Sequence, residues 1–142
     1  MEIANTNETA ARLRRAVTRM NRRLRHSSLG GISPAQASML ESIEKATNPS
    51  LGDLAMAEQM KPPSVTRVVQ SMQESGLIVC TPDPQDRRCT RVQLSALGRK
   101  EITAIRRRKT EFLEKKLLSL SVSDQRKAED LAAFLERLLE EQ

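Results

Sequence analysis

Residues 61–94 constrain the fold of this chain more than any other segment. Pro62-Pro63 suits the first turn of a short helix, which is expected to end near Gly76. Residues 77–80 are apolar, and in residues 91–94 polar and apolar side chains alternate, so both segments are predicted to be strands. A helix that leads directly into a β-hairpin is therefore expected here.

Polar residues 82–88 separate the two strands and are expected to form the tip of the hairpin. Proline has no backbone N–H to donate to a sheet, so Pro82 and Pro84 are assigned to the turn. Arg87 and Arg88 lie at the same tip, beside Asp86. The tip therefore carries two guanidinium groups.

A second short helix is predicted immediately before the first. It opens at Ser50 with Asp53 three residues on, turns Leu54 inward and stops around residues 59–60. The helix after it has an apolar back at i, i+3, i+4 and i+7, formed by Val65, Val68, Val69 and Met72. Two short helices joined by a tight turn and followed by a hairpin are typical of a winged helix-turn-helix.

Further helices are predicted on both sides of this unit. One begins with the capping box of Ser33 and Gln36, a long one follows Ser95 to about residue 118, and the last opens at Ser121. The first, residues 6–28, carries an apolar stripe of Leu13, Val17, Met20 and Leu24. Its other faces carry Arg12, Arg14, Arg15, Arg19, Arg22, Arg23 and Arg25, either as a phosphate- or ligand-facing surface or as a solvated face.

The apolar stripes of the terminal helices are long for one small domain to cover. We therefore expect a mainly α fold with a small β-hairpin wing, in which the N- and C-terminal helices form a homodimer interface. The expected organisation is a dimerisation helix in residues 1–32, a winged helix-turn-helix in residues 33–96 and dimerisation helices in residues 97–142. An extra helical layer on a monomer is the alternative.

Composition narrows the class of protein further. The 142 residues are 38% hydrophobic and 30% charged, with no apolar run near the ~20 residues of a membrane helix and no visible signal peptide. A soluble cytoplasmic protein without membrane contact is expected. The formal net charge of +6 favours a polyanionic partner. An aromatic content of 1% argues against binding single strands by base stacking, which leaves duplex DNA.

Catalytic and metal sites find no support in the sequence. His26 is the only histidine, and Cys80 and Cys89 form no CxxC pair, so no zinc site is expected. No phosphate loop and no nucleophile–base motif is present. We expect a protein that is not an enzyme and needs no cofactor.

The polar front of the helix in residues 62–74 is the predicted DNA-reading surface. In helix-turn-helix proteins the N-terminal end of the second helix enters the major groove. Arg67 suits guanine O6 and N7 or a phosphate, and Arg87 and Arg88 suit a minor groove. Asp86 is expected to orient an arginine or to cap the turn. The candidates are Lys61, Pro63, Ser64, Thr66, Arg67, Gln70, Asp86, Arg87 and Arg88. A merely solvated helix face and an exposed hairpin tip are the alternatives.

These residues resemble the MarR family of transcriptional regulators. The resemblance is carried by Leu54-Ala55, Pro63-Ser64-Val65-Thr66-Arg67, Gly76-Leu77-Ile78, the wing Asp83-Pro84-Gln85-Asp86-Arg87-Arg88, and Val92-Gln93-Leu94-Ser95-Ala96-Leu97-Gly98. It implies a homodimeric DNA-binding regulator that reads a near-palindromic operator through two winged domains, and many members of the family are repressors. It also implies DNA contacts by Ser64, Thr66 and Arg67 and by Arg88, which Asp86 orders.

The family resemblance further implies release from DNA by a small phenolic or other aromatic anion. Members often carry an acidic and then a basic residue where Val79 and Cys80 stand here. The candidate ligand pocket therefore takes Arg19, Arg23 and His26 together with Cys80. Cys80 and Cys89 flank the wing and are candidates either for a redox role, if they lie close across the hairpin, or for plain strand residues.

Three functions remain open on the sequence alone. The leading one is a sequence-specific transcriptional regulator, and the second is an architectural protein that binds duplex DNA with little sequence choice. A winged domain used only for protein contacts is the third. Net charge fits the first two equally, so the ratio of specific to competitor affinity at fixed salt separates them.

Overall fold

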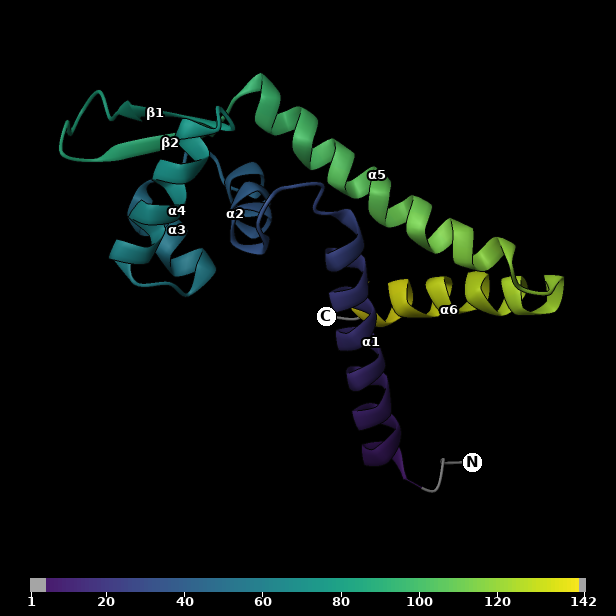
Figure 1. Cartoon of the computed structure of the whole chain (residues 1–142). Helices are drawn as coiled ribbons and strands as arrows, with labels where there is room; N and C mark the ends of the chain where they lie inside the picture. The colour runs from purple at the N-terminus through teal and green to yellow at the C-terminus, as the bar shows by residue number, and fades with distance from the viewer. Residues whose placement is uncertain (1–4, 141–142) are drawn as a thin grey trace.

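The computed structural model describes residues 5–140, so residues 1–4, on which the signal-peptide expectation partly rests, lie outside it. Its elements are α1 (Thr6–Ser28), α2 (Pro34–Lys45), α3 (Leu51–Glu58), α4 (Pro62–Glu74), β1 (Ile78–Pro82), β2 (Thr90–Leu94), α5 (Ala96–Leu118) and α6 (Val122–Glu140). Figure 1 shows the hairpin projecting at one end, with α1 and α6 on the other side of the chain. The predicted mainly helical fold with a two-stranded wing is confirmed.

Serine side chains set the starts of four helices, as the sequence predicts; at α6 the Ser121 hydroxyl accepts from the backbone N–H of Asp124 at 3.1 Å. At α2 the Ser33 hydroxyl accepts from the backbone N–H of Gln36, and the Gln36 side chain accepts from the backbone N–H of Ser33. Ser50 and Asp53 exchange the same two bonds at α3, and Ser95 caps α5. Each cap satisfies N–H groups that have no partner within the helix.

The hairpin corrects the assignment of one proline. Pro82 ends β1 and pairs with Thr90 of β2, whereas the sequence prediction placed it in the turn. A sheet of two strands has only edges, so the missing N–H of Pro82 removes no bond from an inner ladder. Beside the hairpin, the N–H of Val92 donates to the Pro49 carbonyl at 2.9 Å, which ties β2 to the turn before α3.

The hydrophobic core lies between α2 and the first half of α5. Side chains from both short helices, both sides of the hairpin and α5 meet there: Met39, Leu40, Ile43, Leu54, Val65, Val69, Met72, Leu77, Ile78, Val92, Leu94, Ile102 and Ile105. Gly98 permits the close approach of α5, because a Cβ there would overlap the Leu77 carbonyl oxygen. The predicted back of α4 is confirmed, with Val65, Val69 and Met72 buried and Val68 packed against the core.

The terminal helices contribute nothing to this core. No residue of α6 within the described range is buried, and Ser28 is the sole buried residue of α1. Half-exposed apolar side chains follow both helices: Val17, Met20, Leu131, Phe134 and Leu138. In residues 5–140 every helix is too short or too polar to cross a membrane.

Candidate nucleic-acid interface

The helix pair α3–α4 holds one polar surface outward on a buried apolar back. The turn between the helices passes through Gln59 with φ of 51°, and two prolines then fix the first turn of α4. Among the predicted contact residues, Lys61, Pro63, Thr66, Arg67 and Gln70 are exposed or partly exposed, and Ser64 is half-buried. The first turn of α4 carries no acidic residue that would repel a phosphate.

Two side chains on α4 are more constrained than the sequence indicates. The Thr66 hydroxyl donates to the Pro62 carbonyl at 3.0 Å, so the oxygen faces outward mainly as an acceptor. Ser71, although polar, faces α2, where its hydroxyl accepts from the Gln36 side chain at 3.1 Å. Arg67 and Gln70 remain exposed donors on this helix.

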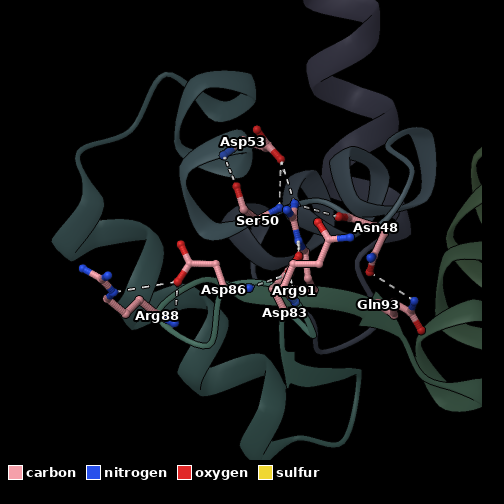
Figure 2. Close-up of polar contacts among 9 residues, drawn as sticks. Asn48, Ser50, Asp53, Asp83, Asp86, Arg88, Arg91 and Gln93 are labelled. Atoms are coloured by element: carbon pink, nitrogen blue, oxygen red, sulfur yellow. Dashed lines mark hydrogen bonds and ion pairs between the residues drawn. The ribbon is translucent and has the colours of Figure 1, made fainter.

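The wing tip is open to solvent and is built around aspartate caps. The Arg88 side chain is 98% exposed, and its Nε lies 3.8 Å from Asp86 Oδ1. Asp86 Oδ1 also accepts from the Arg88 backbone N–H at 3.1 Å (Figure 2). Of the two roles predicted for Asp86, the structure therefore favours capping the turn over holding a guanidinium in a fixed fork.

Arg91 is the residue that the sequence prediction missed at this site. Its Nε donates to Asp83 Oδ2 at 2.7 Å, its Nη1 donates to the Asn48 carbonyl at 3.3 Å, and the same Nη1 lies 3.7 Å from Asp53 Oδ2 (Figure 2). The Gln93 side chain also donates to the Asn48 side-chain oxygen at 3.2 Å. Arg91 thus joins the base of the wing to the start of α3.

The electrostatics of this cluster lower the pKa of both carboxyl groups. The hydrogen bond from Arg91, followed by the N–H groups of Gln85 and Asp86, lowers the pKa of Asp83. Backbone and side-chain bonds to Ser50 come first in lowering the pKa of Asp53. Both carboxylates are therefore stabilised as anions, and Arg91 is held by charge on two sides.

The exposed polar face of α4 and the wing border one groove. This groove, of about 480 Å³, is lined by Leu51, Thr66, Val69, Gln70, Gln73, Cys80, Thr81, Pro82, Arg87 and Thr90. Helix side chains and the wing arginine thus face a common hollow. Cys80 lies in its wall, half-buried, and burial raises the pKa of its thiol.

Of the two alternatives for the cysteines, the one that places Cys80 and Cys89 close across the hairpin is wrong. Cys80 pairs with Val92, and Cys89 stands opposite Asp83, whose N–H donates to the Cys89 carbonyl at 2.8 Å. Three register steps along the strands separate the two positions by ~10 Å, beyond the ~7 Å reach of a disulfide. Both cysteines are free.

The predicted ligand pocket divides between two places. Arg19, Arg23 and His26 line one cleft of about 580 Å³ between α1 and α5, together with Ala16, Met20, Arg22, Phe112 and Lys116. Cys80 lies in the groove beside the wing instead, because β1 faces α4 and not α1. Lys116 Nζ lies 5.1 Å from the centre of the Phe112 ring in the α1–α5 cleft.

Fold and surface together define a winged helix-turn-helix DNA-binding protein. The model of the MarR family matches residues 32–90 of the chain. The chain is 34% identical over 130 residues to the HTH-type transcriptional regulator MT0903.1 of Mycobacterium tuberculosis, covering 89% of this chain and 91% of the relative. This protein belongs to the MarR family of DNA-binding transcriptional regulators, which are not enzymes.

Solved structures share the same fold over nearly the whole chain. A Pseudomonas aeruginosa protein described as a transcriptional regulator is similar with a TM-score of 0.79 and 27% identity, covering 99% of this chain and 100% of the other. A point mutant of MepR from S. aureus, solved with a bound oligodeoxyribonucleotide, has a TM-score of 0.71 at 20% identity. The match covers 92% of this chain and 97% of the MepR chain.

Proposed function

We propose that this protein is a homodimeric repressor that binds a near-palindromic operator with sequence specificity. The observation that carries the proposal is that the exposed polar face of α4 and the arginine wing tip border one groove. An α-helix fits the major groove of B-DNA, where the edges of each base pair differ, and a narrow minor groove attracts guanidinium groups. One protomer therefore offers contacts to neighbouring grooves of one half-site.

Each predicted contact residue except Thr66, whose hydroxyl donates within α4, has a chemical role in this proposal. Arg67 donates to guanine or to a phosphate, and Gln70, one turn further along α4, is placed to read a base edge. Lys61 and Ser64 contact phosphates at the start of the helix, where Pro63 packs against the backbone. Arg87 and Arg88 extend the contact from the wing, the latter at the turn that Asp86 caps. The MepR structure with a bound oligodeoxyribonucleotide supports DNA as the partner.

The terminal helices support the homodimer. Val17 and Met20 of α1 and Leu131, Phe134 and Leu138 of α6 are each about half exposed in the single chain, which leaves apolar surface for a second copy. A twofold dimer presents two α4 helices to two inverted half-sites. A dimer that covers promoter DNA blocks access to it, which favours repression.

Removing two arginines tests the DNA-reading surface. The variant Arg67→Ala with Arg88→Ala is expected to lose about 2 kcal/mol or more of binding free energy, roughly 30-fold in affinity, in fluorescence anisotropy with fragments that the wild type selects. Arg14→Ala with Arg15→Ala is the matched control, because it removes the same charge from exposed positions of α1. Unchanged binding by the first variant would support a winged domain used for protein contacts.

We also propose that a small aromatic anion releases the repressor from DNA by binding in the α1–α5 cleft. The cleft combines the Phe112 ring and Met20 with cationic side chains from α1 and with Lys116, which suits a ligand that is both apolar and negative. Calorimetry with benzoate as the probe is expected to detect binding that Arg23→Ala weakens and Arg12→Ala does not. Benzoate that binds but leaves operator affinity unchanged would contradict the release.

A further inference from the structure

The basic run 106–109 of α5 connects this helix to two others. Arg106 donates from both terminal nitrogens to both carboxylate oxygens of Glu44 in α2, and the Nη1–Oε2 distance is 3.2 Å. Lys109 Nζ lies 3.6 Å from Glu41 Oε1, one turn earlier on the same helix α2. Bidentate pairs between arginine and carboxylate are the stronger and more directional class of ion pair.

Arg108 closes the C-terminal end of α1. Its Nη1 donates to the Ser28 carbonyl at 3.2 Å, and Ser28 is fully buried. Cations are favoured at this end of a helix, where backbone carbonyls lack partners. Gly30 leaves the space that the Arg108 guanidinium fills, because a Cβ at this position would overlap the guanidinium. The φ of +53° at Gly30 also favours glycine. Arg108 therefore holds the junction at which α1 passes into the winged domain.

These contacts lie where α5 leaves the core. Ile105 is the last residue of α5 in the hydrophobic core, and the helix continues to Leu118 with half-exposed and exposed side chains. Figure 1 shows α5 extending from the hairpin away from the winged domain. Past Ile105, α5 contacts α2 and the end of α1 through these polar groups and not through the hydrophobic core. They are thus placed to set the angle at which the helix projects.

We propose that Arg106, Arg108 and Lys109 are positioning residues that form a latch with Glu44, the Ser28 carbonyl and Glu41. The latch fixes the angle between α5 and the winged domain and thereby the separation of the two α4 helices in the dimer, which rests on the homodimer proposed above. A rotation of ~10° at Lys109 moves the far end of α5, ~14 Å away, by ~2 Å. The same displacement in both protomers changes the separation of the two α4 helices by about the ~3.4 Å of one base-pair step. The latch therefore selects the spacing of operator half-sites.

Breaking the strongest pair by charge reversal tests the latch in DNA binding. Glu44→Arg places two guanidinium groups together, and the combination of Glu44→Arg with Arg106→Glu restores an opposite pair. Glu111→Arg is the matched control, because it makes the same charge change but disrupts a pair with Arg107 inside α5 at 3.6 Å. Affinity is measured on the operator that the wild type selects and on versions with one or two base pairs inserted or removed between half-sites.

The wild type and Glu111→Arg are expected to bind the selected spacing about tenfold or more tightly than the altered spacings. For Glu44→Arg this ratio of affinities is expected to be less than about threefold. Comparing ratios between spacings cancels any uniform gain in affinity from added positive charge. The doubly reversed variant is expected to regain the preference. A full preference in Glu44→Arg, or an equal loss in Glu111→Arg, overturns the latch. Selection of sequences without paired half-sites would instead contradict the proposed dimeric operator binding.

A measurement without DNA separates these two failures. Met56 of α3 is 82% exposed, so a spin label on Met56→Cys, in a chain with Cys80→Ser and Cys89→Ser, reports the distance between winged domains of a dimer. Double electron–electron resonance is expected to give a narrow distribution of label-to-label distances for the wild-type latch and a broader or displaced distribution for Glu44→Arg. The doubly reversed variant should return to the narrow distribution. Equal distributions in all three proteins overturn the latch whatever the DNA result.

Discussion

At the scale of single residues, Arg91 shows what a pattern of alternation conceals. In the sequence it is only the polar neighbour of Val92 in a short strand of alternating residues. In the structure its guanidinium holds Asp83 and the Asn48 carbonyl and lies near Asp53. The candidate contacts Arg67, Arg87 and Arg88 could be proposed from the sequence because outward positions of a helix and a turn follow from local rules. The role of Arg91 depends on contacts across the fold.

The Asp83–Arg91 pair predicts a dependence of stability on pH. The pKa of Asp83 is lower in the folded protein than the ~4 of an unfolded chain. Between these two pKa values the unfolded state therefore binds more protons than the folded state. Its contribution to stability is present above pH ~4 and is lost as the pH falls through the lower, folded pKa. In urea unfolding from acidic to neutral pH, Asp83→Asn should flatten the acid-side slope of stability against pH. Glu136→Gln, exposed on α6, serves as the control, and an unchanged slope in Asp83→Asn would contradict the pair's role.

Arg88 predicts a change in the salt dependence of binding. A guanidinium that contacts a phosphate releases counterions, so Arg88→Ala is expected to reduce the slope of log affinity against log salt by about 1. The loss should be similar for all DNA sequences. Anisotropy titrations over a series of salt concentrations measure the slope. A loss confined to one base position would assign Arg88 to base reading instead.

At the scale of elements, boundaries set by local chemistry followed from the sequence and those set by sheet topology did not. Ser33, Ser50 and Ser95 mark helix starts in the sequence and cap them in the structure. Pro82 was misplaced because its tolerance in β1 depends on how many strands the sheet has. The separation of Cys80 from Cys89 likewise depends on strand register, which a sequence pattern does not state.

Two helical glycines predict opposite effects of the same substitution. Alanine is favoured over glycine in a helix interior by ~1 kcal/mol, so Gly52→Ala, at the second residue of α3, should stabilise the protein by up to this amount, since the nearest atom to a new Cβ is 3.7 Å away. Gly98→Ala in α5 should lower stability by about 2 kcal/mol or more, because its Cβ would overlap the Leu77 carbonyl oxygen. Urea unfolding measures both, and a stabilised Gly98→Ala would contradict the close packing of α5.

At the scale of the whole molecule, the sequence predicted apolar stripes on the terminal helices and a homodimer interface formed by them. The structure leaves the stripes of α1 and α6 half-exposed, consistent with the proposed second copy. The cleft that gathers Arg19, Arg23 and His26 also arises at this scale, because α1 and α5 are far apart in the sequence and side by side in the fold. Cys80 was grouped with them on resemblance alone, and the fold separates it.

Removal of α6 is expected to abolish the proposed dimer. A chain ending at residue 121 keeps every residue of the hydrophobic core, so its winged domain should remain folded. It should sediment as a monomer and bind operator DNA weakly, because two half-sites bound by one dimer give tighter binding than one. Circular dichroism checks the fold of the truncated chain. A truncated chain that still sediments as a dimer would place the interface elsewhere.

The central claim, that this protein is a sequence-specific regulator, is tested most directly by selecting genomic DNA fragments with the purified protein and measuring affinity at one fixed salt concentration. We expect enrichment of fragments that share inverted half-sites, bound about a thousandfold or more tightly than competitor DNA of unrelated sequence. A ratio near one across all fragments, its own promoter included, would contradict the claim and support an architectural DNA-binding protein.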